Sequence, residues 1–221
     1  MHLTAQQHEQ RRSTPGPILT MSKDASQRAD HEDIEKISSF LAGDESAFEF
    51  LFDKYRERVY GIAFRFVRNK EDALEVTQDV FIRVYQGLAK FKTDSKFYTW
   101  LYRIATNRAI DYIRSRKAHP AVTASTLESA AGDEGGSFTD RVPDSRAVDP
   151  SETMHRREME HNVLAAVDQL SEKHRAVFVL HAIEQLAYKE IAEVVGCSIG
   201  TVMSRLFYAR KKLQDLLKEY T

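Results

Sequence analysis

The sequence predicts an all-α protein of two small helical domains joined by a flexible linker, with a helix-turn-helix in the C-terminal domain. Apolar residues recur at three- and four-residue spacing over most of the chain, which is typical of amphipathic helices. This periodicity fails between residues 119 and 153. Near the C-terminus, the tight break Val195-Gly196-Cys197-Ser198 joins two helical patterns. A chain of 221 residues is long enough for two such domains.

Composition and charge narrow the class of protein. The chain is 42% hydrophobic and 29% charged, which favours a folded protein. Its net charge of −1 means that any contact with nucleic acid must come from local basic patches. With one cysteine, Cys197, no internal disulfide can form. We find no apolar run long enough to span a bilayer and no signal-type segment, so we expect a cytoplasmic protein without stable membrane insertion.

Changes in composition divide the chain. Residues 1–30 are polar and without a sustained period, so we expect a disordered extension, within which Met21 is a plausible alternative start. The first domain covers residues 31–118, the linker 119–153 and the second domain 154–221. In the linker the acids outnumber the bases Arg141 and Arg146, and this charge serves either solubility or passage through a positively charged channel of a partner.

The first domain contains four predicted helices. A short one over 32–41 precedes a strongly periodic one, and Asn69 is placed to cap the third. The inward residues of the third are Ala73, Thr77, Val80, Phe81, Val84 and Leu88. The fourth, over about 97–117, is rich in basic residues and follows the loop 90–96. Aromatic side chains beside basic ones at this junction suit single-stranded DNA, although Trp100 and Tyr102 also fit a core role.

The second domain leads to the helix-turn-helix. Helices are predicted over about 154–170 and after Ser171, which is placed as a cap. In the next pair, Gly196 suits the left-handed end of the first helix and Ser198 the cap of the second. We expect inward side chains on the last helix at Ile199, Val202, Leu206 and Leu213. A basic outer surface after so short a break indicates a reader of the DNA major groove rather than a hairpin that only packs.

Several segments, in this order, resemble the extracytoplasmic-function (ECF) sigma factors of bacteria. They are Gln-Asp-Val-Phe-Ile-Arg-Val-Tyr at 78–85, Phe-Tyr-Thr-Trp-Leu-Tyr-Arg-Ile-Ala-Thr-Asn at 97–107, Ala-Tyr-Lys-Glu-Ile-Ala at 187–192 and Gly-Thr-Val-Met-Ser-Arg-Leu at 200–206. The resemblance implies a sigma-two domain and a sigma-four domain. It also implies binding to core RNA polymerase, recognition and melting of promoter DNA, control of stress-response genes, and an anti-sigma factor as inhibitory partner.

The resemblance also implies roles for particular residues. The surface that docks on a coiled coil of the largest polymerase subunit would comprise Leu74, Gln78, Asp79, Phe81 and Tyr85. The minus-ten element would be opened and held as a single strand by Phe91, Lys92, Ser95, Lys96, Tyr98, Trp100, Asn107 and Arg108. The minus-thirty-five duplex would be read by Thr201, Ser204, Arg205, Phe207 and Tyr208, with Arg210 and Lys211 near phosphates. Relatives often carry arginine where this chain has Met203 and Tyr208, so guanine readout there is lost.

Two other classes of function share single features with this sequence. A stand-alone helix-turn-helix regulator would use the first domain for dimerisation or sensing, but the aromatic and basic loop favours the sigma factor. An enzyme is disfavoured because the chain has no glycine-rich phosphate loop and no cysteine–histidine cluster. His161, His174 and His181 lack a ligand spacing. We therefore expect no catalytic residues, no metal and no cofactor.

Overall fold

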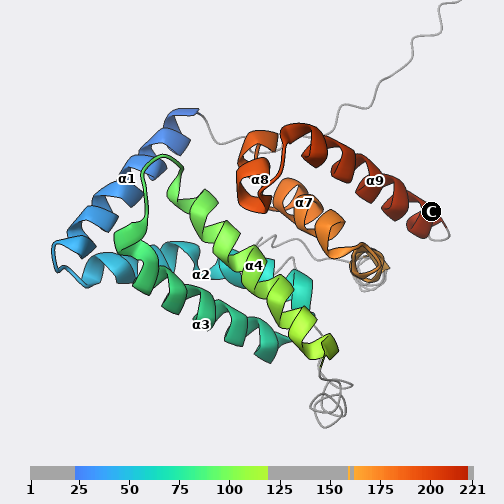
Figure 1. Cartoon of the computed structure of the whole chain (residues 1–221), viewed down its shortest axis with the longest axis horizontal. Coiled ribbons are helices and arrows are strands. Elements are labelled where there is room, and N and C mark those ends of the chain that lie inside the picture. The colour runs from blue at the N-terminus through green and yellow to red at the C-terminus, as the bar shows by residue number, and fades with distance from the viewer. Residues whose placement is uncertain (1–22, 119–158, 160–161, 219–221) are drawn as a thin grey trace, which may run out of the picture.

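The helices of the first domain form a bundle around a buried stripe of α2. The structure is a computed structural model, and it describes residues 23–118, 159 and 162–218. Its first part contains α1 (Lys23–Leu41), α2 (Ser46–Val67), α3 (Lys70–Gly87), the short 3-10 helix η1 (Leu88–Lys90) and α4 (Phe97–Ala118). Figure 1 shows α1 to α4 together on one side of the molecule. The described ranges contain no β-strand, as the all-α prediction requires.

The predicted start of the first helix is wrong. We expected a disordered extension to residue 30 and a helix from Glu32, but α1 already begins at Lys23. Tertiary contacts explain the difference, since the carbonyl of Ala29 accepts a hydrogen bond from Lys54 at 3.3 Å and Asp30 pairs with Lys96 at 3.3 Å. Local periodicity does not contain these contacts. Residues 1–22 lie outside the described ranges, as does the whole predicted linker, 119–153.

Caps begin α3 and α7 at the predicted residues. The side chain of Asn69 accepts a hydrogen bond from the Asp72 backbone at 2.9 Å, which satisfies one open donor of α3. The hydroxyl of Ser171 does the same for His174 at the start of α7 (Glu172–Ala182). Before α7, the backbone is helical at 162–168, inside the helix predicted over 154–170. The sequence-predicted capping therefore sets where these elements begin.

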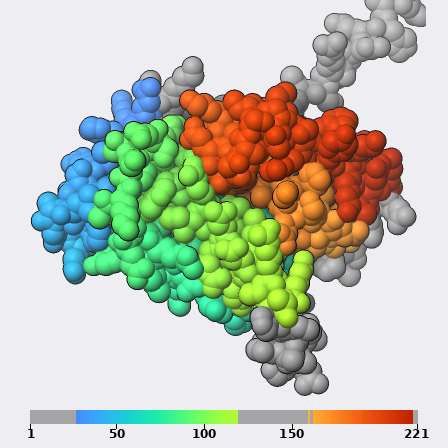
Figure 2. Space-filling view, viewed as in Figure 1, coloured from blue at the N-terminus to red at the C-terminus, as the bar shows by residue number. Residues whose placement is uncertain are grey.

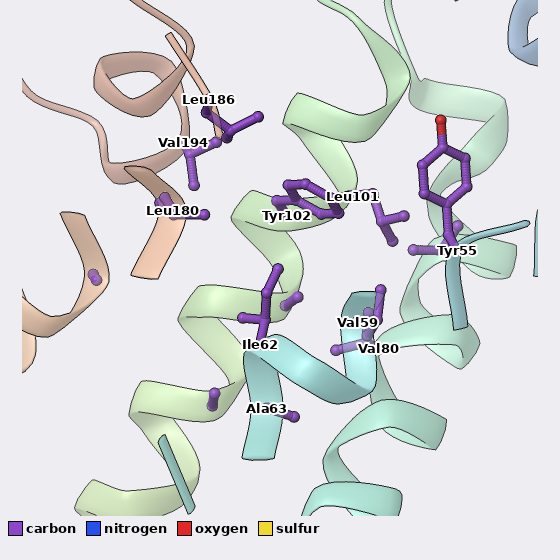
Figure 3. Packing of buried hydrophobic residues seen from close by; sticks show 14 of the residues in the cluster. Tyr55, Val59, Ile62, Ala63, Val80, Leu101, Tyr102, Leu180, Leu186 and Val194 are labelled. Carbon is purple, nitrogen blue, oxygen red and sulfur yellow. The ribbon is translucent and has the colours of Figure 1, made fainter. Parts of the chain in front are cut away.

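The second bundle packs directly on the first. It contains α7, α8 (Tyr188–Val195) and α9 (Ile199–Leu217), and Figure 2 shows it lying against the surface of α4. One cluster of buried apolar side chains runs through both bundles, from Ile62 and Tyr102 to Leu180, Leu186 and Val194, as Figure 3 shows. The predicted two helical units are present, but they share a continuous core across their boundary.

Polar contacts reinforce this boundary at the other end of the molecule. Arg68, which ends α2 with a left-handed φ of 60°, donates to Asp168 at 2.9 Å and to the carbonyl of Leu164 at 2.8 Å. Arg175 of α7 donates to the carbonyl of Phe66 at 3.2 Å. Arg114 of α4 pairs with Glu172 at 2.9 Å. The two bundles are therefore held together by charged hydrogen bonds as well as by apolar burial.

Candidate functional site

The helix-turn-helix has the geometry that the sequence predicted. Helices α8 and α9 meet at an angle of 97°. Gly196 ends α8 with a φ of 65°, a left-handed conformation that glycine adopts without steric cost. Ser198 accepts a hydrogen bond from the Thr201 backbone at 3.2 Å and so caps α9. Ala187 has no capping oxygen, but its backbone N–H donates to Glu190 at 3.0 Å. This acid fixes the start of α8 from inside the helix.

The outer face of α9 is open to solvent. Val202, Leu206 and Leu213 are buried as predicted, whereas Ile199, which we expected to point inward, is 45% exposed. Ile199 stands in the first turn, beyond the part of α9 that packs on the bundle. Of the predicted minus-thirty-five residues, Ser204, Phe207, Tyr208, Arg210 and Lys211 are exposed, and Thr201 and Arg205 are half-buried. The structure thus brings this predicted set together on one helix.

Most of the predicted single-strand site lies at the start of α4, but unlike the face of α9 its aromatic side chains are partly buried. Phe91 is half-buried and stacks edge-on against Phe97, with ring centroids 5.8 Å apart, and it also contacts Trp100 at 5.3 Å. Tyr102 is buried, so it belongs to the core. Lys92, Lys96 and Asn107 are exposed, while Ser95, Tyr98, Trp100 and Arg108 are half-buried. The aromatic residues of this site therefore support one another and leave only part of each ring open.

Glu190 of α8 reaches across the boundary to this site. Its carboxylate accepts a hydrogen bond from the hydroxyl of Tyr98 and another from Lys96, the latter at 3.2 Å. Lys96 also donates to the oxygen of Tyr98 at 3.1 Å and pairs with Asp30 of α1. Two predicted DNA-binding side chains are therefore engaged by an acid of the other bundle. We name Glu190, Tyr98 and Lys96 the Glu190 clamp.

The electrostatics of the clamp favour its charged form. Burial opposes the shift, but the hydrogen bonds from Tyr98, the Ala187 backbone and Lys96 lower the pKa of the Glu190 carboxyl. Burial and the bond to Glu190 raise the pKa of Tyr98 to about 12. For Lys96, burial acts downward, yet its bonds to Tyr98 and Glu190 raise its pKa. At neutral pH the clamp thus holds a carboxylate between a neutral hydroxyl and an ammonium.

A second part of the α4 surface also faces the helix-turn-helix. Arg103 and Asn107 line an open hollow whose opposite wall is formed by residues 192–197. Asn107, predicted to help hold the single-stranded minus-ten element, therefore lies opposite the end of α8 and the turn before α9. The hollow is therefore bounded by α4 on one side and by the end of α8 and the following turn on the other.

Asp79 and Arg108, predicted for two different surfaces, form an ion pair with each other. Arg108 donates to one carboxylate oxygen of Asp79 through Nε at 2.7 Å and through Nη2. The side chain of Arg108 is 19% exposed and that of Asp79 is 37% exposed. The pair joins α4 to α3 and therefore couples the position of the two predicted surfaces.

The predicted polymerase-binding face of α3 needs one correction. Phe81 is 5% exposed and packs on Phe52 with ring centroids 4.7 Å apart, so it belongs to the core. Its neighbour Ile82 is 53% exposed instead. Ile82 continues the outward stripe of Leu74, Gln78 and Tyr85 at helical spacing. The period of inward residues predicted for this helix includes Phe81 and leaves Ile82 outside it, so periodicity already places Ile82, and not Phe81, on the outer face.

Comparisons with known proteins agree with this arrangement of two bundles. Residues 51–119 match the family described as Sigma-70 region 2, and residues 160–213 match Sigma-70, region 4. The RNA polymerase sigma-H factor of Pseudomonas aeruginosa is 38% identical over 197 residues, which cover 87% of this chain and 98% of that protein. The chain belongs to the RNA polymerase sigma factors.

Further relatives support the assignment. The ECF RNA polymerase sigma-E factor of Haemophilus influenzae is 33% identical over 88% of this chain and 98% of its own length. A solved structure of CnrH in complex with the cytosolic domain of CnrY has a TM-score of 0.61, with 25% identity, 86% of this chain covered and 99% of that chain. This chain is therefore an ECF sigma factor. It acts as an RNA polymerase sigma factor, and that family is not a class of enzymes. The comparisons therefore favour this function over that of a stand-alone regulator.

Two structural findings complete the description of the site. In the described ranges no single helix has the length and apolar composition of a membrane span, and α8 and α9 reach that composition only together across their bend. The same residues include no group of three or more histidine, cysteine or acidic side chains arranged for a metal ion. Glu190 and Asp30, which contact the predicted DNA-binding side chains Tyr98 and Lys96, were not singled out from the sequence.

Proposed function

We propose that this sigma factor binds core RNA polymerase through α3, melted minus-ten DNA through the loop and start of α4, and minus-thirty-five duplex through α9. The observation that carries the proposal is the open outer face of α9 in a capped helix-turn-helix. By likeness to its relatives, its partners are core polymerase, promoter DNA and an anti-sigma factor, and it works in the cytoplasm on stress-response genes. The solved structure of CnrH contains the cytosolic domain of a second protein, CnrY, and we propose that an anti-sigma factor binds this chain as a protein partner of the same kind.

The outward stripe of α3 supplies the surface for polymerase. Leu74, Ile82 and Tyr85 are 54%, 53% and 47% exposed, and Gln78 lies among them. Apolar anchors around a hydrogen-bonding side chain are the usual composition of a protein interface. Because Phe81 lies beneath this stripe, its contribution is to position α3 and not to touch the partner.

Binding of the melted strand requires the two bundles to separate at the Glu190 clamp. While Glu190 holds them, the hydroxyl of Tyr98 and the ammonium of Lys96 are engaged in hydrogen bonds within the protein, and these bonds must be exchanged before either group bonds to a phosphate. Each base stacked on an aromatic ring contributes about 1–3 kcal/mol, which is enough to compete with two exchanged hydrogen bonds. We therefore propose that polymerase and DNA take up the open form of the chain.

The test is reconstitution with core polymerase and two matched variants. Ile82→Ala should weaken binding to core polymerase by roughly tenfold and leave the binding of duplex promoter DNA unchanged. Arg210→Ala should leave polymerase affinity unchanged and reduce the salt dependence of upstream-element binding by about one counterion. Absence of any polymerase affinity in the wild-type chain would overturn the proposal in favour of a stand-alone regulator.

A further inference from the structure

The open face of α9 carries an apolar stripe. Ile199, Met203 and Phe207 are 45%, 54% and 62% exposed, and their four-residue spacing places them one above another on the helix. Tyr208, 59% exposed, packs edge-on against Phe207 with ring centroids 5.4 Å apart. The opposite face of α9 buries Val202, Leu206, Ala209 and Leu213. The residues of the stripe are thus not needed to pack the core of the bundle and remain exposed.

Polar side chains beside the stripe already have partners within the domain. Ser204 donates its hydroxyl to the carbonyl of Thr201 at 3.0 Å. The hydroxyls of Thr201 and Ser198 bond to each other at 2.9 Å, and Arg205 approaches the sulfur of Cys197 at 3.7 Å. The surface that projects furthest from this helix is therefore mainly apolar, in contrast with a helix that reads bases through amide or guanidinium groups.

Positive charge flanks the stripe on the following turn. Arg210 and Lys211 are both exposed there, whereas Lys212 donates to the carbonyl of Gln169. A narrow apolar row that ends in cations suits a partner whose surface is anionic outside and apolar at a few points inside a groove. Duplex DNA has this character, because phosphates line the major groove and the C5 methyl of thymine is the one apolar group on its base edges.

We infer that Ile199, Met203 and Phe207 read thymine methyl groups in the major groove of the upstream promoter element. The inference rests on the proposed function, in which α9 enters that groove. From residue 199 to residue 207 the helix advances about 12 Å, roughly the rise of three to four base pairs. The stripe therefore selects thymine at up to three neighbouring positions on either strand, where an arginine at position 203 would select guanine.

The experiment begins with selection. Reconstituted holoenzyme is used to select duplexes from a pool randomised over the upstream element. In the selected duplex, each thymine is then replaced singly by deoxyuridine, which removes only the methyl group. At one to three positions this should weaken wild-type binding about fourfold, the change that corresponds to about 0.8 kcal/mol for one buried methyl-sized group.

Variants assign the effect to the stripe. With Met203→Ala or Phe207→Ala, replacing thymine by deoxyuridine at the matching position should no longer weaken binding of the duplex. The reason is that the side chain that contacted the methyl group is already gone. Leu41→Ala, which truncates a 53% exposed apolar residue of α1, is the control and should keep the full methyl dependence. Thermal unfolding of each variant checks that the exposed substitutions leave the fold unchanged.

The outcomes separate the inference from the proposed function. If the holoenzyme selects a specific upstream element but no deoxyuridine replacement weakens binding, the methyl readout is wrong and the sigma factor assignment stands. That result would leave the stripe as a surface for a protein partner. If no upstream element is selected at all, both the role of α9 and the inference fail.

Discussion

The two surfaces that would meet promoter DNA differ in what the folded chain does with them. The outer face of α9 is open, with Phe207 and Tyr208 about 60% exposed. At the start of α4, by contrast, Tyr98 and Lys96 are held by Glu190 and the α8 helix stands over Asn107. With the roles proposed above, the duplex-reading surface is open in the closed chain, whereas full access to the strand-reading surface would require the bundles to part.

This difference has a physical consequence for the order of events. A surface that is already exposed binds its ligand at full affinity, while one that is exposed in a small fraction of molecules binds with its affinity reduced by that fraction. Free sigma factor should accordingly bind single-stranded minus-ten DNA poorly. A partner that binds only the open form removes this penalty. Releasing the Glu190 clamp should reduce this difference in accessibility between the two surfaces, and altering α9 alone should change only the duplex-reading surface.

The largest expected effect comes from Glu190→Lys. The substitution removes the acceptor of Tyr98 and places a second cation beside Lys96, so we expect the closed form to lose about 2 kcal/mol and binding of single-stranded minus-ten DNA by the free chain to increase roughly 30-fold. Fluorescence anisotropy with a labelled oligonucleotide measures it. Asp53→Lys makes the same change of charge at an exposed site of α2 that pairs locally with Arg56. An equal gain in single-strand affinity in that control would show that the net charge of the chain, and not release of the clamp, increases the binding.

The next effect concerns the exposed face of α9. Met203→Arg places a guanidinium on the exposed stripe of α9, and a bidentate contact to guanine provides about 1–3 kcal/mol of discrimination, or about 5- to 150-fold. Competition between duplexes that differ at one base pair measures this preference. Because α9 is open in both forms, the preference should have the same size with and without Glu190→Lys. A preference that appears only in the double variant would mean that α9 is also covered.

The contrast between these surfaces also shows what sequence reasoning reached. Periodicity and capping residues predicted α2, α3, α4 and the helix-turn-helix, because each is decided by neighbours within one or two turns. Ile199 was placed wrongly because the same period continues into a turn that has no bundle to pack on. Glu190 was missed because its partners Tyr98 and Lys96 are more than 90 residues away in the chain, and no local pattern reports such a contact.

A smaller effect is expected from Tyr98→Phe. The variant keeps the ring that would stack on a base and removes the hydroxyl that donates to Glu190. Glu190 retains its bonds to Lys96 and to the Ala187 backbone, so the closed form should lose about 1 kcal/mol, and single-strand binding should rise about fivefold. Duplex binding should not change. If single-strand binding falls instead, the hydroxyl contacts the strand and the clamp is not what limits access.

The smallest effect is a dependence of the closed form on pH. Burial raises the pKa of Glu184, at the end of α7, although Arg58 and Arg65 of α2 act in the opposite direction. When the bundles part, this carboxyl returns towards its ordinary pKa. The closed form then binds the proton more readily than the open form, so it gains stability as the pH falls through the raised value and loses it as the pH rises.

As the pH falls from 7.5 to 5, the ratio of closed to open chain should therefore increase. Glu190 has the opposite sign, because its pKa is lowered in the closed form, and its contribution is lost only at more acidic pH. Small-angle scattering of the free chain measures the ratio. Glu184→Gln should remove the slope, while Asp53→Asn, away from the boundary, should keep it. A slope that survives Glu184→Gln would assign the proton to another group and would leave the clamp as the feature that distinguishes the two surfaces.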